Sequence, residues 1–255
     1  MMTSRATTEW FTAVKPDPRQ RLRLFCFPYA GGTAHIFREW PDGLPKSVQV
    51  CTAHLPGRGA RIRERPFGDI RELVERLGRE IQPFLDMPFA FFGHSMGAMI
   101  SFELARHLRR ESGPQPLQLF VSGRRAPQLP VTEPTSYDMP EEVFKERLRT
   151  LNGTPAEVLE HPELMELMLP LLRADFSVVE TYEYVEEPPL DVPITVFGGL
   201  QDHKVGRDEL TPWREQTTAN VTVRMLPGDH FFLNTVRPTL LGLLSKELDR
   251  LAAAI

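Results

Sequence analysis

A G-x-S-x-G pattern occupies the residues Gly93-His94-Ser95-Met96-Gly97. In such a pattern the serine lies on a strained turn between a strand and a helix, and the flanking glycines allow close backbone approach. The turn raises the serine hydroxyl above the edge of the sheet, at the positive end of the following helix. We therefore predict that Ser95 is a nucleophile and that the Met96 N–H stabilises an oxyanion formed beside it. A glycine-lined turn without chemistry is the alternative.

A serine hydroxyl is a poor nucleophile without a neighbouring base, so the chain must supply a histidine. The sequence holds seven histidines. His230 follows the apolar run Val221–Leu226 and precedes the last helical pattern, which is where the histidine of this serine chemistry lies. We predict that His230 is the base and that His94 packs locally. His35 and His54 follow other strand ends and could also line a site, although packing in a loop is the simpler interpretation.

The third member of such a site is a carboxylate that fixes the histidine tautomer and stabilises its charged form. Asp202 lies in the loop after the apolar run Ile194–Gly199. The loop after the preceding strand is a rival position, but its first carboxylate is Glu133. Asp229 is a second alternative because it adjoins His230, yet neighbouring side chains in a loop rarely reach the required geometry. Asp202 is therefore the predicted partner of the histidine.

The elements that would position these residues begin with six short apolar runs. Each is rich in β-branched or aromatic residues and is bounded by Pro, Gly or Asp, which predicts a buried strand. The runs cover Leu22–Pro28, Val48–Leu55, Phe89–His94, Leu117–Gly123, Ile194–Gly199 and Val221–Leu226. Their near-continuous apolar character is typical of a parallel sheet that is covered on both faces.

Helical patterns separate these runs. Three segments carry apolar residues three and four positions apart, which predicts amphipathic helices over Ile70–Leu85, Ala98–Arg109 and Leu240–Leu251. Strands and helices therefore alternate, as in a doubly wound α/β domain. A chain of this length fits one such domain, and we expect it to span residues 1–255.

One segment, residues 132–187, interrupts the alternation. It has no convincing strand and carries helical pieces at Glu141–Leu151, Ala156–His161 and Glu163–Tyr184, separated by prolines. A structureless loop of this length is improbable in a compact domain. We predict a helical insertion that covers the strand ends as a lid.

Composition excludes several classes of protein. The net charge of −4 is spread along the 255 residues, which argues against a nucleic-acid binder, and no stretch approaches the roughly 20 apolar residues of a membrane span. The two cysteines, Cys26 and Cys51, are too few for a disulfide framework, so we predict a cytoplasmic protein with both as core residues. The chain has no H-E-x-x-H, C-x-x-C or glycine-rich nucleotide motif, so we predict no metal and no cofactor.

Longer motifs occur in a fixed order along nearly the whole chain. They are FCFPYAGGTAHIFREW (Phe25–Trp40), LPGRGARIRERP (Leu55–Pro66), FFGHSMGA (Phe91–Ala98), VSGRRAP (Val121–Pro127), VFGGLQD (Val196–Asp202) and PGDHFF (Pro227–Phe232). This set resembles the type II thioesterases of polyketide and nonribosomal peptide biosynthesis. The resemblance implies an α/β-hydrolase fold, with a mostly parallel central sheet flanked by helices and a helical lid.

The same resemblance implies hydrolysis of acyl thioesters on the phosphopantetheine arm of acyl or peptidyl carrier proteins. Position by position, it gives Ser95, Asp202 and His230 the roles of a catalytic triad. It also gives the backbone N–H groups of Met96 and Ala30 the role of an oxyanion hole. The paired glycines after Ala30 agree with this role because they free the backbone to turn N–H groups inward. A simple glycine turn is the alternative.

Two further surfaces are open to more than one interpretation. A basic landing area for an acidic carrier protein, or solvated arginines paired with glutamates, would account for Arg58, Arg61, Arg63, Arg65, Arg124 and Arg125. An acyl channel, or ordinary core packing, would account for Leu164, Met165, Leu167, Met168, Leu169, Leu171, Leu172 and Phe176. We expect a monomer. A chain-releasing thioesterase or another serine esterase, and a catalytically inactive scaffold that binds carrier proteins, are the alternative functions.

Overall fold

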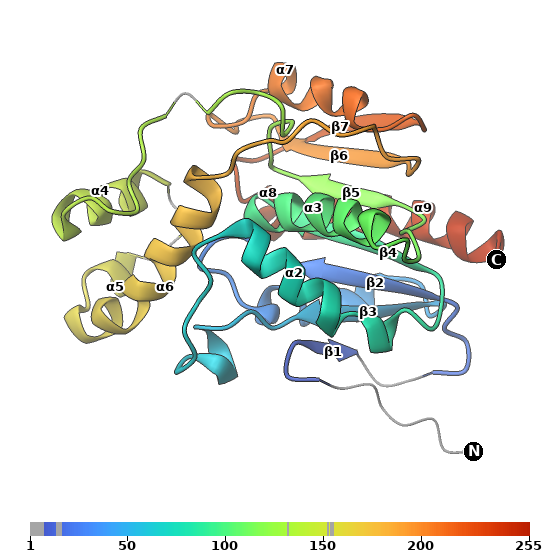
Figure 1. The fold of residues 1–255 in the computed structure, drawn as a ribbon, viewed down its shortest axis with the longest axis horizontal. Coiled ribbons are helices and arrows are strands. Elements are labelled where there is room, and N and C mark those ends of the chain that lie inside the picture. The colour runs from blue at the N-terminus through green and yellow to red at the C-terminus, as the bar shows by residue number, and fades with distance from the viewer. Residues whose placement is uncertain (1–7, 14–16, 132, 152, 154–155) are drawn as a thin grey trace.

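The computed structural model describes residues 8–13, 17–131, 133–151, 153 and 156–255. Within them the chain forms a seven-stranded sheet in the order β1-β3-β2-β4-β5-β6-β7 (Figure 1). The strands are β1 (Phe11–Ala13), β2 (Leu22–Phe27), β3 (Val48–Ala53), β4 (Phe89–His94), β5 (Leu119–Ser122), β6 (Ile194–Gly199) and β7 (Val221–Leu226). Neighbouring strands are parallel except for the antiparallel pair β1 and β3. The predicted, mostly parallel sheet is therefore confirmed.

Both faces of the central strands are buried, and successive side chains enter different cores. Phe91 belongs to the core beneath α2 (Ile70–Glu80) and α3 (Met96–Arg110), whereas Phe92 belongs to the core beneath α9 (Arg237–Ala253). This follows from the alternation of side chains along a strand. Figure 1 shows α2 and α3 on one side of the sheet and α9 on the other. A strand that supplies two cores must be apolar along its whole length, as these strands are.

The predicted helix over Ile70–Leu85 is shorter in the structure. The Asp69 side chain accepts hydrogen bonds from two N–H groups of the first turn and so begins α2 where expected. The helix ends at Glu80 and gives way to a 3-10 turn, η3 (Gln82–Phe84), because Pro83 has no N–H to continue the ladder. The other short elements are η1 (Ala34–Phe37), α1 (Trp40–Gly43), η2 (Gly59–Arg61), α7 (Arg207–Leu210), η4 (Thr211–Gln216) and α8 (Phe232–Thr235).

Strand β1 has no counterpart among the sequence predictions, because three residues are too few to show an alternating pattern. Its Phe11 is fully buried, with ring centroids 5.5 Å from those of Phe25 and Phe84. β1 pairs Phe11 with Ala53 and runs antiparallel to β3. A short strand at this edge leaves few backbone groups open to pairing with another chain.

Three helices follow one another within residues 132–187. They are α4 (Glu141–Leu151), α5 (Ala156–Leu159) and α6 (Pro162–Glu180). The described residues of this segment contain no strand, and each helix starts within one residue of its predicted start. In Figure 1, α4, α5 and the beginning of α6 project beyond one end of the strands, at the left of the view.

The insertion has a small core of its own and a firm connection to the main body. The small core contains Phe144, Leu148, Leu159, Met165 and Leu172. Val178, near the end of α6, belongs instead to the main core beneath α2 and α3. Pro170 interrupts the hydrogen-bond ladder of α6 because it lacks an N–H. The small core continues beyond it to Leu172, and only the end of α6, at Val178, belongs to the main core.

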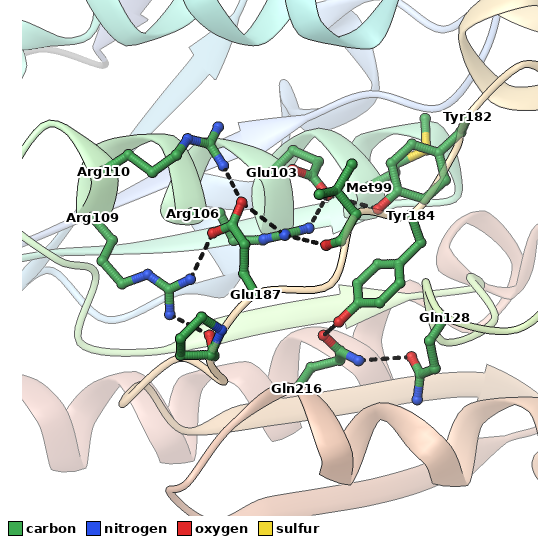
Figure 2. A network of polar contacts seen from close by, with 12 residues as sticks. Met99, Glu103, Arg106, Arg109, Arg110, Gln128, Tyr182, Tyr184, Glu187 and Gln216 are labelled. Carbon is green, nitrogen blue, oxygen red and sulfur yellow. Dashed lines mark hydrogen bonds and ion pairs between the residues drawn. The ribbon is translucent and has the colours of Figure 1, made fainter.

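A polar network ties the chain after α6 to α3 (Figure 2). Glu187 accepts contacts from three arginines of α3, with N–O distances of 2.7 to 2.8 Å. These arginines are Arg106, Arg109 and Arg110. The Tyr182 hydroxyl donates a hydrogen bond of 2.6 Å to Glu103 on the same helix. The return from the insertion to β6 is thus held against α3, the helix that follows Ser95.

Two further sequence expectations concern the cysteines and membrane-spanning helices. Cys26 and Cys51 are buried free cysteines on the neighbouring strands β2 and β3, which confirms them as core residues. Over the part of the chain that the structure describes, no helix combines the length and the apolar character needed to cross a bilayer.

Candidate active site

Ser95 lies on the sharp turn between β4 and α3. Its φ of 53° is in the left-handed region, where a non-glycine residue is strained. The flanking glycines are required by contact: a Cβ on Gly93 would lie 2.0 Å from Gly97 O, and one on Gly97 would lie 2.1 Å from Phe27 O. The Ser95 N–H donates to Ser122 O at 2.8 Å, which anchors the turn to β5. The predicted turn is thus present, with its serine half-buried.

Two backbone N–H groups adjoin this turn. Met96 begins the 15-residue helix α3, and the first N–H groups of a helix have no partner within it. Ala30 follows β2, and its N–H makes no hydrogen bond to any described residue. Ala30 and Ser95 line the same pocket. Both N–H groups are therefore available to a negative oxygen formed at Ser95, which is the role predicted for them.

His230 and Asp202 are joined by a hydrogen bond of 2.7 Å between Nδ1 and Oδ2. Asp202 follows β6, and His230 follows β7, so the carboxyl ends of two adjacent parallel strands bring them together. Asp202 is fixed further by the backbone N–H groups of Lys204 and Val205, at 2.9 and 3.2 Å from Oδ1. Its side chain is fully buried, whereas that of His230 is 14% exposed.

Asp202 is held in its charged form. Burial alone would raise its pKa, but the hydrogen bond and charge of His230 and the two backbone N–H groups outweigh burial. The pKa of Asp202 therefore lies below its ordinary value. A charged Asp202 keeps the His230 proton on Nδ1 and leaves Nε2 as the basic nitrogen.

His230 lines the same pocket as Ser95 and Ala30. Among the described residues no hydrogen bond joins the Ser95 hydroxyl to His230. In enzymes without bound substrate this contact is often long, and it tightens when substrate binds. The arrangement supplies a nucleophile, a base fixed by a carboxylate, and two N–H donors around one pocket, which is what acyl transfer requires.

His94, next to Ser95 in the chain, packs locally as predicted. It is fully buried, with Nδ1 2.9 Å from Ser122 Oγ. Its ring centroid lies 5.2 Å from that of His230. Burial, and then the charge of His230, hold the pKa of His94 well below its ordinary value. His94 is therefore a neutral support beneath the pocket.

The rival residues have other partners. Asp229 is exposed and accepts a hydrogen bond from the Phe231 N–H at 2.8 Å. Glu133 is paired with Arg147. His35 lines a second pocket, and the pKa of His54 is lowered by burial and then by the charge of Arg61. None of these four residues forms a hydrogen bond with the ring of His230, which is bonded to Asp202.

Sequence reasoning did not predict that two cationic residues would line the pocket. Lys204 lines the pocket, and its pKa is lowered to about 8 by burial and then by the charge of Arg147. Arg124 also lines it, and burial lowers its pKa to about 10. The signal for Lys204 was its place two residues after Asp202. Across the described residues, no group of three or more His, Cys, Asp or Glu side chains could hold a metal ion.

The arginine set divides between its two interpretations, and pairing with acidic residues holds for two of its members. Arg58 and Arg61 are 5% and 8% exposed and pair with Asp175 and Glu64. They are unavailable to a partner, because charged side chains buried with an acid satisfy each other. Arg63 and Arg65 are exposed, and the other two members of the set line the pocket.

The apolar residues of the insertion divide between the two interpretations. Leu172 and Phe176 line the pocket, together with Leu148 of α4. Met165 and Leu171 are buried, which is the core-packing interpretation. The remaining residues of the set are half-buried or exposed.

The sequence of this chain matches the family description "Thioesterase domain" over residues 22–248. Among curated proteins, the gramicidin S biosynthesis protein GrsT of Aneurinibacillus migulanus is 48% identical over 240 residues. That similarity covers 94% of this chain and 94% of GrsT.

Solved structures give the same result. The RedJ thioesterase from the prodiginine biosynthetic pathway of Streptomyces coelicolor is 40% identical, with a TM-score of 0.84 over 92% of this chain and 94% of RedJ. The type II thioesterase BorB from the borrelidin biosynthetic cluster is 31% identical, with a TM-score of 0.84 over 95% of this chain and 97% of BorB. The predicted α/β-hydrolase fold is thereby confirmed.

Proposed function

Because this chain belongs to the thioesterase family of hydrolases, we propose that it removes acyl groups from the phosphopantetheine arm of carrier proteins. Its similarity to GrsT and to the type II thioesterase BorB supports a place in nonribosomal peptide or polyketide biosynthesis, as an enzyme that clears stalled or wrongly loaded carriers. The buried free cysteines agree with work in the reducing cytoplasm. We further propose that it acts there as a monomer.

The proposed mechanism proceeds through an acyl-enzyme. His230 Nε2 takes the proton of Ser95 as its Oγ attacks the thioester carbonyl carbon, and the N–H groups of Ala30 and Met96 stabilise the oxyanion. The carbon–sulfur bond breaks, and the pantetheine sulfur leaves with the proton from His230. A water molecule, deprotonated by His230, then attacks the acyl-enzyme and releases the free acid and Ser95. Asp202 holds the imidazole throughout.

The observation that carries this proposal is the 2.7 Å contact between His230 and Asp202 at the wall of the pocket that also contains Ser95. The pocket extends from Ser95 to apolar side chains of α4 and α6, among them Leu148 and Phe176. It therefore suits an acyl chain. We propose that the helices of residues 132–187 form the lid over this chain.

The first test is Ser95→Ala. We expect kcat for acyl-loaded carrier proteins to fall by about 10³- to 10⁶-fold, because the nucleophile is removed. The fold and the thermal unfolding temperature should change little, because the substitution removes only the hydroxyl of a half-buried side chain and leaves the backbone turn the same. Release of free acid by purified enzyme is measured on a panel of carriers with different acyl groups. Turnover of the alanine variant close to that of the wild type would contradict the proposal.

The acyl-carrier panel, oxygen-ester substrates and a fluorophosphonate probe distinguish the alternatives. A chain-releasing thioesterase would prefer full-length chains, and a general serine esterase would hydrolyse oxygen esters as readily as thioesters. An inactive scaffold would bind carriers but would not react with a fluorophosphonate probe at Ser95.

A further inference from the structure

A buried ion pair joins the second half of α6 to the loop that precedes η2. Arg58 and Asp175 are 5% and 2% exposed, and two parallel N–O contacts of 2.8 and 2.7 Å join them. This two-pronged geometry is the one best able to offset the removal of both charges from water. A buried ion pair can serve stability alone, but both members of this pair also contact the turn that contains Ala30.

Both partners bind the turn that contains Ala30. Asp175 Oδ2 accepts a hydrogen bond from the Gly31 N–H at 2.7 Å, and Arg58 Nη1 donates to Gly32 O at 3.2 Å. Leu172 lies three residues before Asp175 on the same face of α6. A Cβ on Gly31 would lie 2.8 Å from Leu172 Cδ2, so α6 also packs directly on the turn.

The direction of the Gly31 N–H distinguishes two possible conformations of this turn, type I and type II. Gly32 N–H donates to Tyr29 O at 2.9 Å, and Gly31 has a φ of 74° whereas Ala30 does not have a positive φ. These features fit a type II turn. In a type I turn the peptide between Ala30 and Gly31 would be flipped, and its N–H would point away from Asp175. The carboxylate therefore favours the type II form, and with Arg58 it anchors Gly31 and Gly32, the two residues that follow Ala30 in the turn.

We propose that Asp175 is a positioning residue for thioester hydrolysis, and that its carboxylate, held by Arg58, anchors at Gly31 the turn that presents the Ala30 N–H to the oxyanion. This inference rests on the proposed function. An oxyanion exists in the transition state and not in the bound substrate, so a misdirected N–H lowers kcat and leaves KM nearly unchanged. A purely structural ion pair would lower stability without this division.

The decisive comparison uses two double variants that both lack the ion pair. In R58M/D175N the amide oxygen still accepts from Gly31, whereas in R58M/D175L no acceptor remains. Both replace the charges with neutral side chains, a change that buried ion pairs commonly tolerate. We expect kcat of the leucine variant to be about 10- to 100-fold below that of the asparagine variant, with KM for an acyl-N-acetylcysteamine thioester within about threefold. R58M/D175A gives the same comparison if leucine prevents folding.

A second measurement follows the transition state directly. The inhibition constant of a trifluoromethyl ketone, which forms an oxyanion on Ser95, should rise in parallel with the loss in kcat/KM. Glu187→Gln is the matched control, because it weakens a part-buried ion-pair network on α3 (Figure 2), and the ion-pair partners of Glu187 are arginines of α3 and not residues of the turn. Its kcat should stay within about twofold of the wild type.

The outcomes separate the two proposals. If the wild-type enzyme does not hydrolyse thioesters, the proposed function fails. If it does, and the asparagine and leucine variants are folded and share one kcat, the positioning role of Asp175 is overturned while the function stands.

Discussion

His94 is the buried last residue of β4, directly before Ser95, and its side chain lies between Ser122 of β5 and His230. Its Nδ1 contacts Ser122 Oγ, and its ring lies edge-on to the ring of Phe232, with centroids 5.5 Å apart. A Cβ on Gly123 would lie 2.6 Å from its Cε1, so the imidazole fills its site closely. A protonated imidazole in this position would be buried beside His230 without a carboxylate of its own. Neutrality of His94 is therefore a condition of the native state.

This condition makes stability depend on pH. The pKa of His94 is held well below its ordinary value by burial and by His230, whereas in the unfolded chain it is about 6.5. Below pH 6.5 the unfolded state binds a proton that the native state does not, so the free energy of unfolding falls as pH falls, by up to about 1.4 kcal/mol per pH unit. We expect urea unfolding to show this loss between pH 7 and 5. In His94→Asn, whose amide occupies the place of Nδ1, the slope should be smaller by about one proton.

Any remaining slope in the variant belongs to other groups. The pKa of His54 is also lowered, first by burial and then by Arg61, so it contributes in the same pH range. Asp202 acts at lower pH, because a lowered carboxylate pKa removes stability only as pH falls through that pKa. Equal slopes for the wild type and His94→Asn between pH 7 and 5 would show that His94 is protonated in the native protein.

At the scale of elements, strands bounded by residues that break regular structure were predictable from sequence. β4, β6 and β7 have their predicted bounds because proline, glycine or asparagine flanks each run. The sequence prediction made α2 too long. The apolar spacing continues past Pro83, whereas the helical hydrogen-bond ladder cannot continue there because proline has no N–H. β1 could not be predicted, since its place depends on pairing with β3, which is distant in sequence.

The same distinction applies to the candidate site. Ser95, Asp202 and His230 each follow a strand end, so an argument from chain order brings them to one edge of the sheet. Asp175 and Arg58 carried no such signal, because their contact joins residues 117 positions apart. A lone aspartate within the apolar run of α6 was the one hint that sequence offered.

The polar network on α3 gives a prediction for stability alone. Glu187 binds three arginines, and its side chain is 21% exposed, whereas that of Arg106 is 3% exposed. Glu187→Gln leaves Arg106 buried with less compensating charge, so we expect the free energy of unfolding to fall by about 1–3 kcal/mol. Urea unfolding at pH 7 measures this change. A loss in kcat beyond about twofold would contradict the separation of this network from the site.

At the scale of the whole molecule, the three apolar cores differ greatly in extent. The sheet is covered on both faces by large clusters, whereas α4 and α5 rest on a small cluster that includes Phe144 and Met165. Local opening is easiest where few apolar contacts are broken. The second half of α6 is held by its contacts with Gly31, Gly68 and the main core. The insertion should therefore open at α4 and α5 while the end of α6 stays in place.

Amide hydrogen exchange tests this division. Peptides from Glu141–Leu151 should exchange about tenfold faster or more than peptides from Met96–Arg110. Leu148 and Leu151 of α4 line the pocket, so phosphonylation of Ser95 with a long-chain alkyl fluorophosphonate should slow exchange in α4. A methyl fluorophosphonate, whose chain cannot reach α4, is the matched control and should not slow it. Equal effects of the two probes would mean that the acyl chain does not lie beneath α4, because only the long chain could add contacts there.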